Sequence, residues 1–348
     1  MRLRLSLLAV LCAAAFTVVP SALADSPAAS DTNPVHYYLS LGDSLAQGYQ
    51  PIGGPPSPLG FPGYNQGYAD QLLKLVRDRY EDLRLVKLAC GGESTTTMIV
   101  GSPWCGADFP AGSQLAEAKA FLQVHRGEVA FVTINIGGND VTSPEEGGVA
   151  AIEANLPVIL AQLRAAAGPG VPIVGMSYYH PFLPDVWFGT HDPAALQGAV
   201  DWILGFNGLL ASLYAAAGDP VADVETAFST SDVGDADGDG VPTDVEQVCA
   251  WTWRCTPPPH GPDIHPNSAG YGVIAHAFET RSNRERRVQN RCGAVQRRVH
   301  GVGFTNSIAV EIGQIHAPDR IYAPYARGSV NTNVFRRSHR HQFALGTR

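Results

Sequence analysis

Basic residues are scarce in most of this 348-residue sequence. Between residues 25 and 283 there are 10 lysines and arginines against 29 aspartates and glutamates, a net charge of −19. Nucleic acids are bound through basic side chains that contact phosphates, so this deficit excludes nucleic acid as the partner of that region. An acidic surface is instead typical of an extracellular protein that its own charge keeps soluble.

Long apolar runs are also lacking beyond the N-terminus. Arg2 and Arg4 precede an apolar stretch over residues 5–19, and Ala22-Leu23-Ala24 supplies small residues at the usual cleavage positions. This pattern predicts a secretory signal peptide over residues 1–24. An uncleaved anchor is the alternative, but the stretch is shorter than the roughly 20 residues that a membrane span needs. We find no other stretch long and apolar enough, and we therefore expect a secreted, extracellular protein without a transmembrane segment.

The sequence has no CxxC pair and no histidine spacing typical of a zinc site. With Cys12 removed in the signal peptide, the remaining cysteines are Cys90, Cys105, Cys249, Cys255 and Cys292. The first two bracket one loop-like segment and the next two bracket another. In an oxidising compartment this arrangement predicts two local disulfides and leaves Cys292 without a partner.

Strand-like and helix-like segments alternate along the chain, without an internal repeat. The strand-like segments are 36–41, 85–89, 129–136, 171–176 and 220–224. The helix-like segments are 67–81, 113–126, 147–167, 192–217 and 268–281. This alternation predicts βαβ units and a parallel sheet with helices on both faces. In such a sheet, reactive groups gather beyond the carboxyl ends of the strands.

Two segments interrupt this alternation. Residues 51–63 are rich in proline and glycine, and we expect them to line the entrance to a site. Residues 229–262 are expected to form a long irregular loop with an acidic half and a half rich in cysteine, tryptophan and proline. Trp251 and Trp253 are expected to alternate on a short extended stretch of that loop, where they either line an acyl pocket or cap the core.

Polar groups follow three of the predicted strands, at Ser44, Gly92 and Asn139, and Asp263 and His265 come near the C-terminal end of the domain. A serine hydroxyl needs a base that a third group orients. The Asp263 carboxylate could hold Nδ1–H of His265, which leaves Nε2 to take the proton of Ser44. The negative charge that develops in the reaction needs fixed donors, and the backbone N–H groups of Ser44 and Gly92 and the side-chain amide of Asn139 are candidates.

Four short blocks contain these residues, and together they resemble the SGNH hydrolase superfamily, also called GDSL esterases and lipases. The blocks are Gly42-Asp43-Ser44-Leu45, Ala89-Cys90-Gly91-Gly92-Glu93-Ser94, Gly137-Gly138-Asn139-Asp140 and Asp263-Ile264-His265-Pro266. The resemblance extends over about residues 37–278, and Ala46 excludes the G-x-S-x-G pattern of other hydrolases.

The resemblance implies a fold, an activity and a set of residue roles. The fold is a three-layer α/β/α arrangement around a central parallel five-stranded sheet of the flavodoxin-like type. The four name-giving roles fall on Ser44, Gly92, Asn139 and His265, with Asp263 as the orienting residue.

We therefore predict a monomeric carboxylic ester hydrolase, an esterase or lipase that forms an acyl-enzyme on Ser44 and needs no cofactor for catalysis. Its substrate is a small-molecule or lipid ester. A carbohydrate deacetylase or a phospholipase on the same fold stays open, and a non-catalytic, calcium-stabilised extracellular binding module is the alternative of a different class. His180, which also follows a strand, is the rival base, and Asp140 is expected to cap a helix.

An acidic stretch in the long loop matches the pattern D-x-D-x-D-G-x5-E of calcium-binding loops. Its ligands would be Asp235, Asp237, Asp239 and Glu246. Pro242 stands where such loops carry a β-branched apolar residue, and no entering helix is evident. The stretch is therefore either a structural calcium site or a solvated acidic turn.

Basic residues are concentrated in the tail over residues 284–348, which holds 12 of the 24 in the chain, all of them arginines. The segment has no clear periodicity. It is either a basic anchor for an acidic cell envelope or a disordered or artefactual extension. We accordingly place the hydrolase domain in residues 25–283.

Overall fold

A computed structural model describes residues 36–51, 65–80, 82–143 and 147–281. The predicted signal peptide, nearly all of the proline- and glycine-rich segment and the basic tail lie outside the described residues.

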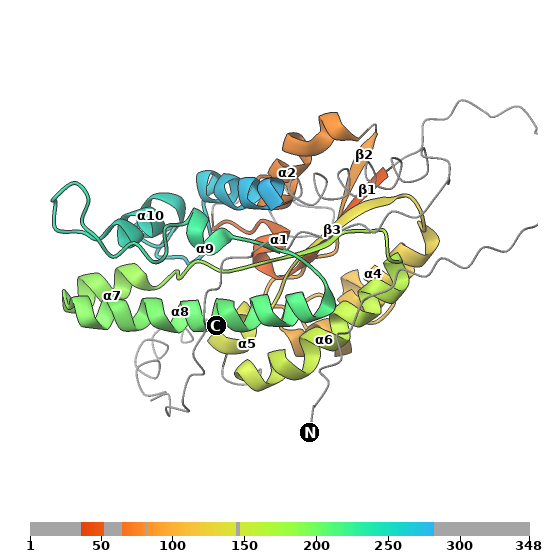
Figure 1. The fold of residues 1–348 in the computed structure, drawn as a ribbon, viewed down its shortest axis with the longest axis horizontal. Helices are drawn as coiled ribbons and strands as arrows, with labels where there is room; N and C mark the ends of the chain where they lie inside the picture. Colours follow the sequence, from red (N-terminus) through yellow and green to blue (C-terminus); the bar gives the residue numbers. More distant parts are fainter. Residues whose placement is uncertain (1–35, 52–64, 81, 144–146, 282–348) are drawn as a thin grey trace, which may run out of the picture. The chain divides into compact units, whose positions relative to one another are not determined.

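The centre of the protein is a parallel sheet of five strands, as predicted (Figure 1). The strands are β1 (His36–Gly42), β2 (Leu83–Lys87), β3 (Val129–Asn135), β4 (Ile173–Met176) and β5 (Val221–Ala222). Their order is β2-β1-β3-β4-β5, and every neighbouring pair is parallel. The chain runs from β1 to one side of the sheet, to β2, and then returns past β1 to β3 on the other side. Open sheets of this type bind their ligands at such a point, between β1 and β3.

Helices cover both faces of the sheet and confirm the three-layer α/β/α class (Figure 1). One face carries α4 (Gln114–Val124), α6 (Gly148–Ala167) and α8 (Pro193–Ala217). The other carries α2 (Tyr68–Val76) and a final helix over residues 268–281. The ring of Tyr68 stacks on that of Phe278, with ring centroids 4.9 Å apart, and so joins these two helices.

Shorter helices complete the described part of the chain. They are α1 (Ser44–Gln47), α3 (Thr95–Val100), α5 (Gly138–Thr142), α7 (Leu183–Thr190), α9 (Val224–Ala227) and α10 (Thr243–Trp251), with 3-10 turns at Arg77–Arg79 and Gly106–Asp108. Three of them, α1, α3 and α5, carry or adjoin the polar blocks that follow β1, β2 and β3. They set the direction in which those blocks leave the sheet.

The strand β1 lies in the middle of the core, with Tyr38, Leu39 and Leu41 fully buried. A strand covered on both faces has to be apolar at successive positions, which explains why its sequence does not alternate. At its end, Gly42 has a φ of +131°, and a Cβ atom there would lie 2.0 Å from the carbonyl oxygen of Asn135. Only glycine allows β1 to approach β3 this closely.

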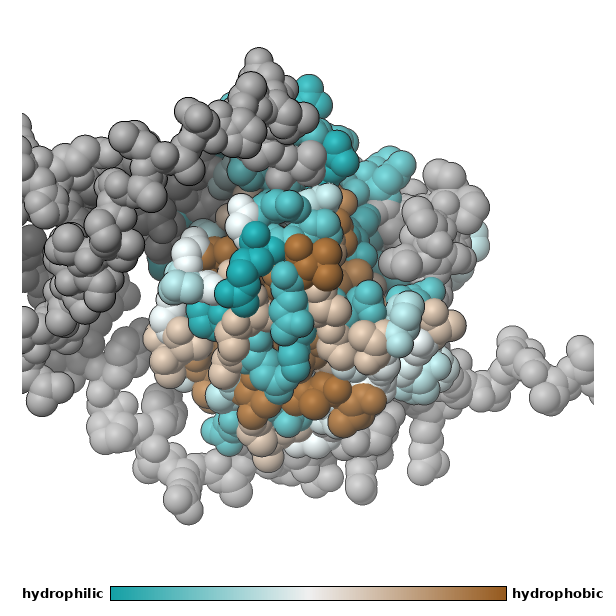
Figure 2. Space-filling model, turned by 90° about the vertical axis from the view of Figure 1, so that its right-hand side faces the viewer, coloured by the Kyte–Doolittle hydropathy of each residue, from teal (hydrophilic) through white to brown (hydrophobic). Residues whose placement is uncertain are grey.

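Two core helices correct the expectation that no later segment is apolar enough for a membrane span. By length and composition, α6 and residues 193–216 of α8 pass that test. Both helices nevertheless contribute to the main core of the protein, α6 through Leu156 and Leu160 and α8 through Ile203 and Leu210. Figure 2 shows one face of the protein, where hydrophobic patches alternate with hydrophilic residues, as is usual for protein surfaces.

The region over residues 229–262 is less irregular than predicted, because it contains the helix α10. Trp251 is the last residue of this helix, so the two tryptophans do not share an extended stretch. Val245 and Val248, three positions apart, turn inwards and join a small apolar cluster with Leu183 and Leu196. Cys249 and Cys255 were interpreted as the two ends of a loop, and the helical spacing of the apolar residues before them was therefore not predicted.

Candidate active site

Ser44 is the first residue of α1, directly after β1, and is half-buried. Asp43 caps this short helix, because its Oδ1 accepts the backbone N–H of Leu45 at 2.8 Å. The same oxygen accepts Nδ2 of Asn135 at 2.6 Å, and Oδ2 accepts the hydroxyl of Tyr178 at 3.3 Å. These three donors fix the turn that presents Ser44 at the carboxyl end of the sheet.

The pKa of the Asp43 carboxyl group is raised above its ordinary value. Burial raises its pKa from 3.8 to about 6, although the hydrogen bonds from Leu45 and Asn135 oppose this shift. A buried carboxylate is costly because it has lost hydration. Asp43 therefore accepts a proton more readily than an exposed aspartate does.

The predicted nucleophile, base and orienting carboxylate lie within hydrogen-bond distance of one another. Oγ of Ser44 is 2.8 Å from Nε2 of His265, and Nδ1 of His265 is 2.8 Å from Oδ1 of Asp263. Burial alone would raise the pKa of Asp263, but the hydrogen bond and charge of His265 outweigh it and lower that pKa below its ordinary value. An ionised carboxylate at Nδ1 selects the tautomer whose Nε2 can accept the serine proton.

The segment that carries His265 is held by its neighbours on two sides. The backbone N–H of Trp253 donates to the carbonyl of His265 at 3.0 Å, and that of Asp263 donates to the carbonyl of Trp253 at 3.1 Å. The hydroxyl of Tyr179 donates to the carbonyl of Ile264 at 2.7 Å. A rigid support of this kind keeps the imidazole aimed at the serine.

The two predicted disulfides are present, and both lie next to the site. One joins Cys249 to Cys255, in the stretch that pairs with the Asp263-x-His265 segment. The other joins Cys90 to Cys105 and closes the segment that begins beside Gly92.

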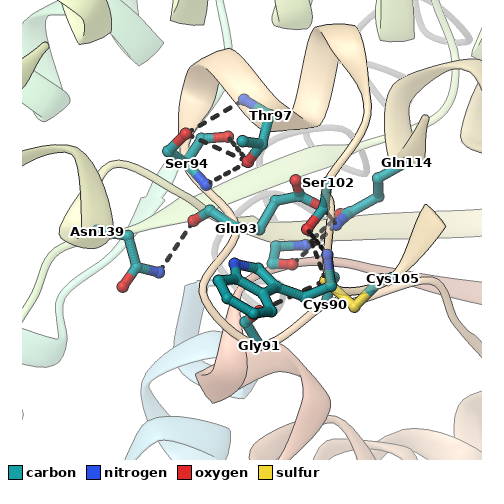
Figure 3. The surroundings of a disulfide bond; sticks show 11 residues. Cys90, Gly91, Glu93, Ser94, Thr97, Ser102, Cys105, Gln114 and Asn139 are labelled. Atoms are coloured by element: carbon teal, nitrogen blue, oxygen red, sulfur yellow. Dashed lines mark hydrogen bonds between the residues drawn. A yellow bond between two sulfur atoms is a disulfide. The ribbon is translucent and has the colours of Figure 1, made fainter. Parts of the chain in front are cut away.

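The candidate oxyanion donors come from the ends of β1, β2 and β3. Gly92 is exposed in the turn between β2 and α3, with a φ of +77° that favours glycine. Asn139 lies in α5, and its Nδ2 donates to the carbonyl of Glu93 at 2.9 Å (Figure 3). This bond uses one N–H of the amide and fixes its plane beside the turn of Gly92, which leaves the second N–H for a ligand.

Sequence reasoning missed a buried pair that connects these elements. Gln114, the first residue of α4, clamps the backbone of Gly42: its Oε1 accepts the N–H at 2.7 Å, and its Nε2 donates to the carbonyl at 2.9 Å. The same Nε2 donates to Oε2 of Glu93 at 2.8 Å (Figure 3). Both side chains are fully buried. The only signal in the sequence was a glutamine at the start of a helix, 72 residues from its partner.

His180, the rival base, and Asp140, the expected helix cap, make other contacts in the structure. His180 is buried, its Nδ1 accepts the backbone N–H of Phe182 at 3.2 Å, and burial lowers its pKa to about 4. Asp140 does not cap α5, whose N-cap residue is Gly137. Its carboxylate instead accepts the backbone N–H of Thr95 at 2.9 Å and so joins α5 to α3, because it points across to the neighbouring helix.

The acidic stretch brings three of its four predicted ligands together. Oxygens of Asp235, Asp237 and Asp239 lie within 4.8 Å of one another, and all three residues are exposed. Glu246 is not part of that group and lies in the first turn of α10. Loss of hydration and the charges of the three aspartates raise its pKa. The carboxylates now accept N–H groups of their own loop, including that of Gly240 at 2.9 Å from Oδ2 of Asp235.

Several solved structures share features with this chain. It is similar to an extracellular lipase from Streptomyces rimosus, with 21% identity, a TM-score of 0.44 and coverage of 71% of this chain and 100% of that chain. It is also similar to a variant of an acetyl xylan esterase from Geobacillus stearothermophilus, with 17% identity, a TM-score of 0.41 and coverage of 70% of this chain and 92% of that chain. A third similar structure is that of phospholipase A1 from Streptomyces albidoflavus NA297, with 16% identity, a TM-score of 0.42 and coverage of 71% of this chain and 99% of that chain. The comparison with curated proteins found no match.

The family of this protein is assigned by a family model and not by these structural similarities. The model described as "GDSL-like Lipase/Acylhydrolase family" matches residues 40–273, more than half of the chain. The match begins just before the Gly42-Asp43-Ser44-Leu45 block and ends after His265. It therefore includes all four blocks on which the sequence resemblance was based. The protein belongs to the GDSL-like lipase/acylhydrolase family and is a carboxylic ester hydrolase.

Proposed function

We propose that the protein is a secreted esterase or lipase that cleaves carboxylic esters through an acyl-enzyme on Ser44. The observation that supports this most directly is the continuous chain of contacts from Oγ of Ser44 through the imidazole of His265 to the carboxylate of Asp263, each 2.8 Å long. A chain of this kind raises the reactivity of a serine hydroxyl that is otherwise a weak nucleophile.

In the first half of the reaction, Oγ of Ser44 attacks the carbonyl carbon of the ester while its proton moves to Nε2 of His265. The carbonyl oxygen becomes negative, and the N–H groups of Ser44 and Gly92 and the amide of Asn139 stabilise it. The bond to the alcohol then breaks, and the alcohol leaves with the proton from His265. In the second half, His265 takes a proton from water, which attacks the carbonyl carbon of the acyl group. The bond between the acyl group and Oγ of Ser44 then breaks, His265 returns the proton to Oγ, and the acid leaves.

The natural ester is the open part of this proposal. The family includes lipases, and relatives in structure are described as an acetyl xylan esterase and a phospholipase. Deacetylation of a carbohydrate or cleavage of a phospholipid are therefore the alternatives on the same site. Export is supported by the N-terminal pattern and by two disulfides, which form in oxidising compartments.

The test of the mechanism compares the wild type with Ser44→Ala on p-nitrophenyl esters. We expect turnover to fall by a factor of about 10⁴ or more, as in other serine hydrolases that lose their nucleophile. A fluorophosphonate probe should add its mass to the wild type and not to Ser44→Ala. Ser212→Ala, which removes an exposed serine of α8, is the matched control and should keep both properties. Retained turnover or labelling in Ser44→Ala would reject the proposal, and a wild type that neither reacts nor labels would favour a binding module.

We further propose that Asp235, Asp237 and Asp239, with Glu246 from α10, hold a structural calcium ion that catalysis does not require. The oxygen donors fit the chemistry of this hard cation, and α10 starts where the pattern places the helix that follows such a loop. We expect calcium to raise the melting temperature of the wild type and not of Asp237→Asn, at unchanged kcat for a soluble ester. Equal melting curves of the wild type with calcium and with a chelator would show a solvated acidic turn instead.

A further inference from the structure

Trp104 lies beside the candidate oxyanion glycine, although it follows Gly92 by twelve positions in the sequence. A Cβ atom at Gly92 would lie 3.7 Å from Cδ1 and 3.9 Å from Nε1 of this indole. The five-membered edge of the ring therefore borders the backbone of Gly92. The side chain is 72% exposed, so the rest of the ring faces solvent next to the site.

The backbone of Trp104 is fixed, which an exposed tryptophan on an ordinary loop would not be. Its neighbour Cys105 is bonded to Cys90, and the two cysteines form a small buried cluster with Phe109. The backbone N–H of Trp104 donates to Oγ of Ser102 at 3.2 Å, and Ser102 is itself buried. A backbone held in this way keeps the indole next to Gly92, so less conformational entropy is lost when a ligand packs there than on a mobile loop.

The segment that carries this ring is uncharged. No charged side chain occurs between Glu93 and Asp108 in the sequence, and Val100 in the same segment is 70% exposed. A single exposed apolar residue needs no explanation, but an exposed indole beside the proposed oxyanion glycine, in an uncharged segment, has the chemistry that binds hydrocarbon.

We propose that Trp104 is a specificity-determining residue that packs on the acyl chain of the ester while the carbonyl oxygen lies at Gly92. This proposal rests on the proposed function, because it assigns a substrate class to the same site. The enzyme should then prefer esters of longer fatty acids to acetates. The disulfide between Cys90 and Cys105 serves this preference by keeping the indole beside the oxyanion donor.

The test uses the full chain and a series of p-nitrophenyl esters from acetate to octanoate, each as dissolved monomers. For Trp104→Ala we expect kcat/KM to fall roughly tenfold or more with octanoate, through a higher KM, because several buried CH₂ groups lose their contact. With acetate, the change should stay within about twofold, because no chain reaches the ring. Trp104→Leu should keep part of the preference for octanoate, and Phe188→Ala, which removes another exposed aromatic residue, should change nothing.

Other outcomes would overturn the proposal. An equal loss with all chain lengths, or no loss with any, would show that the ring does not contact the acyl chain. A loss confined to acetylated xylan would assign the ring to a sugar, and one confined to phospholipid vesicles would assign it to a lipid surface. Acetate hydrolysis that still depends on Ser44 keeps the proposed function in each of these cases. Thermal melting of Trp104→Ala and Trp104→Leu confirms that any loss arises in the folded enzyme.

Discussion

Asp263 binds His265 twice through one oxygen. Its Oδ1 accepts Nδ1–H of the ring at 2.8 Å and also the backbone N–H of His265 at 2.9 Å. The first bond selects the tautomer, and the second fixes the distance between the two residues. Because both bonds converge on one oxygen, a substitution that preserves shape but changes charge separates the electrostatic role of the carboxylate from its geometric role.

The first prediction concerns Asp263→Asn. The amide retains the size of the carboxylate but favours the tautomer with the proton on Nε2, which cannot accept the proton of Ser44. We expect kcat to fall by a factor of about 10² to 10⁴ while KM stays within about threefold. Steady-state kinetics on a soluble ester measure both, and Asp201→Asn, at an exposed position of α8, is the control. A variant with normal kcat would remove Asp263 from the catalytic group.

The second prediction follows from the buried carboxyl of Asp43. Its pKa of about 6 in the folded protein lies above the ordinary value of 3.8, so the folded state binds the proton more tightly than the unfolded state does. This contribution to stability is fully present below about pH 4 and is lost as the pH rises through about 6.

Asp43→Asn removes this titration but keeps an oxygen for the N–H groups of Leu45 and Asn135. Relative to the variant, the wild type should gain up to about 3 kcal/mol of unfolding free energy between about pH 7 and pH 4. Urea unfolding at several pH values measures this difference, and the other titrating groups cancel in the comparison. A difference that does not change with pH would show that the carboxyl of Asp43 titrates as usual.

At the scale of elements, α4 reaches the site through its first residue. Gln114 satisfies both backbone groups of Gly42, two residues before the nucleophile, and also contacts the carboxylate of Glu93. Glu93 in turn holds the amide of Asn139 through its carbonyl. The segments at the ends of β1, β2 and β3 are thus connected through one polar network.

The third prediction concerns Gln114→Ala, which leaves the buried N–H of Gly42 without this partner, whereas the carbonyl of Gly42 keeps the backbone N–H of Cys90 at 3.0 Å. A buried group that loses its partner costs about 1 to 3 kcal/mol, so we expect a loss of about 1 to 3 kcal/mol in unfolding free energy. Because the strand end also becomes less fixed, kcat should fall more than KM rises. Denaturant unfolding and kinetics on a soluble ester measure the two effects, with Gln197→Ala, an exposed glutamine of α8, as control. Full stability in Gln114→Ala would mean that water replaces the clamp.

The sequence predicted mainly those features that depend on residues close together in the chain. Strands such as β1 and long helices such as α8 are marked by local patterns of apolar residues, and they were predicted. The Asp263-x-His265 pair was also visible, because its members are two positions apart. The clamp of Gln114 on Gly42 depends on the packing of distant segments, and no local pattern encodes it. The helix α10 was missed for a different reason, because Cys249 near its end and Cys255 beyond it were interpreted as the two ends of a loop.

At the scale of the whole molecule, charge is distributed unevenly along the chain. Residues 25–283 carry a net charge of −19, whereas the tail over residues 284–348 holds 12 arginines and three acids. The residues proposed for catalysis all belong to the acidic part, which also contains helices on both faces of the sheet. An anionic surface would therefore repel the acidic part and attract the tail.

The last prediction separates these two parts by ending the chain after residue 283. Because the final helix still packs on α2 through Phe278 and Tyr68, we expect the shortened protein to keep its melting temperature. Its kcat/KM for a soluble ester should stay within about twofold of the full chain, since all residues proposed for catalysis precede residue 283 in the sequence.

The same pair of proteins tests the anchor hypothesis for the tail. If the arginines bind an acidic envelope, the full chain should sediment with vesicles that contain phosphatidylserine, and the shortened protein should not. This binding should weaken as salt is added, because exposed charges are screened. If neither protein sediments, the tail is not an anchor. If the shortened protein loses activity on a soluble ester, the tail takes part in the hydrolase domain, and the boundary that we place at residue 283 is wrong.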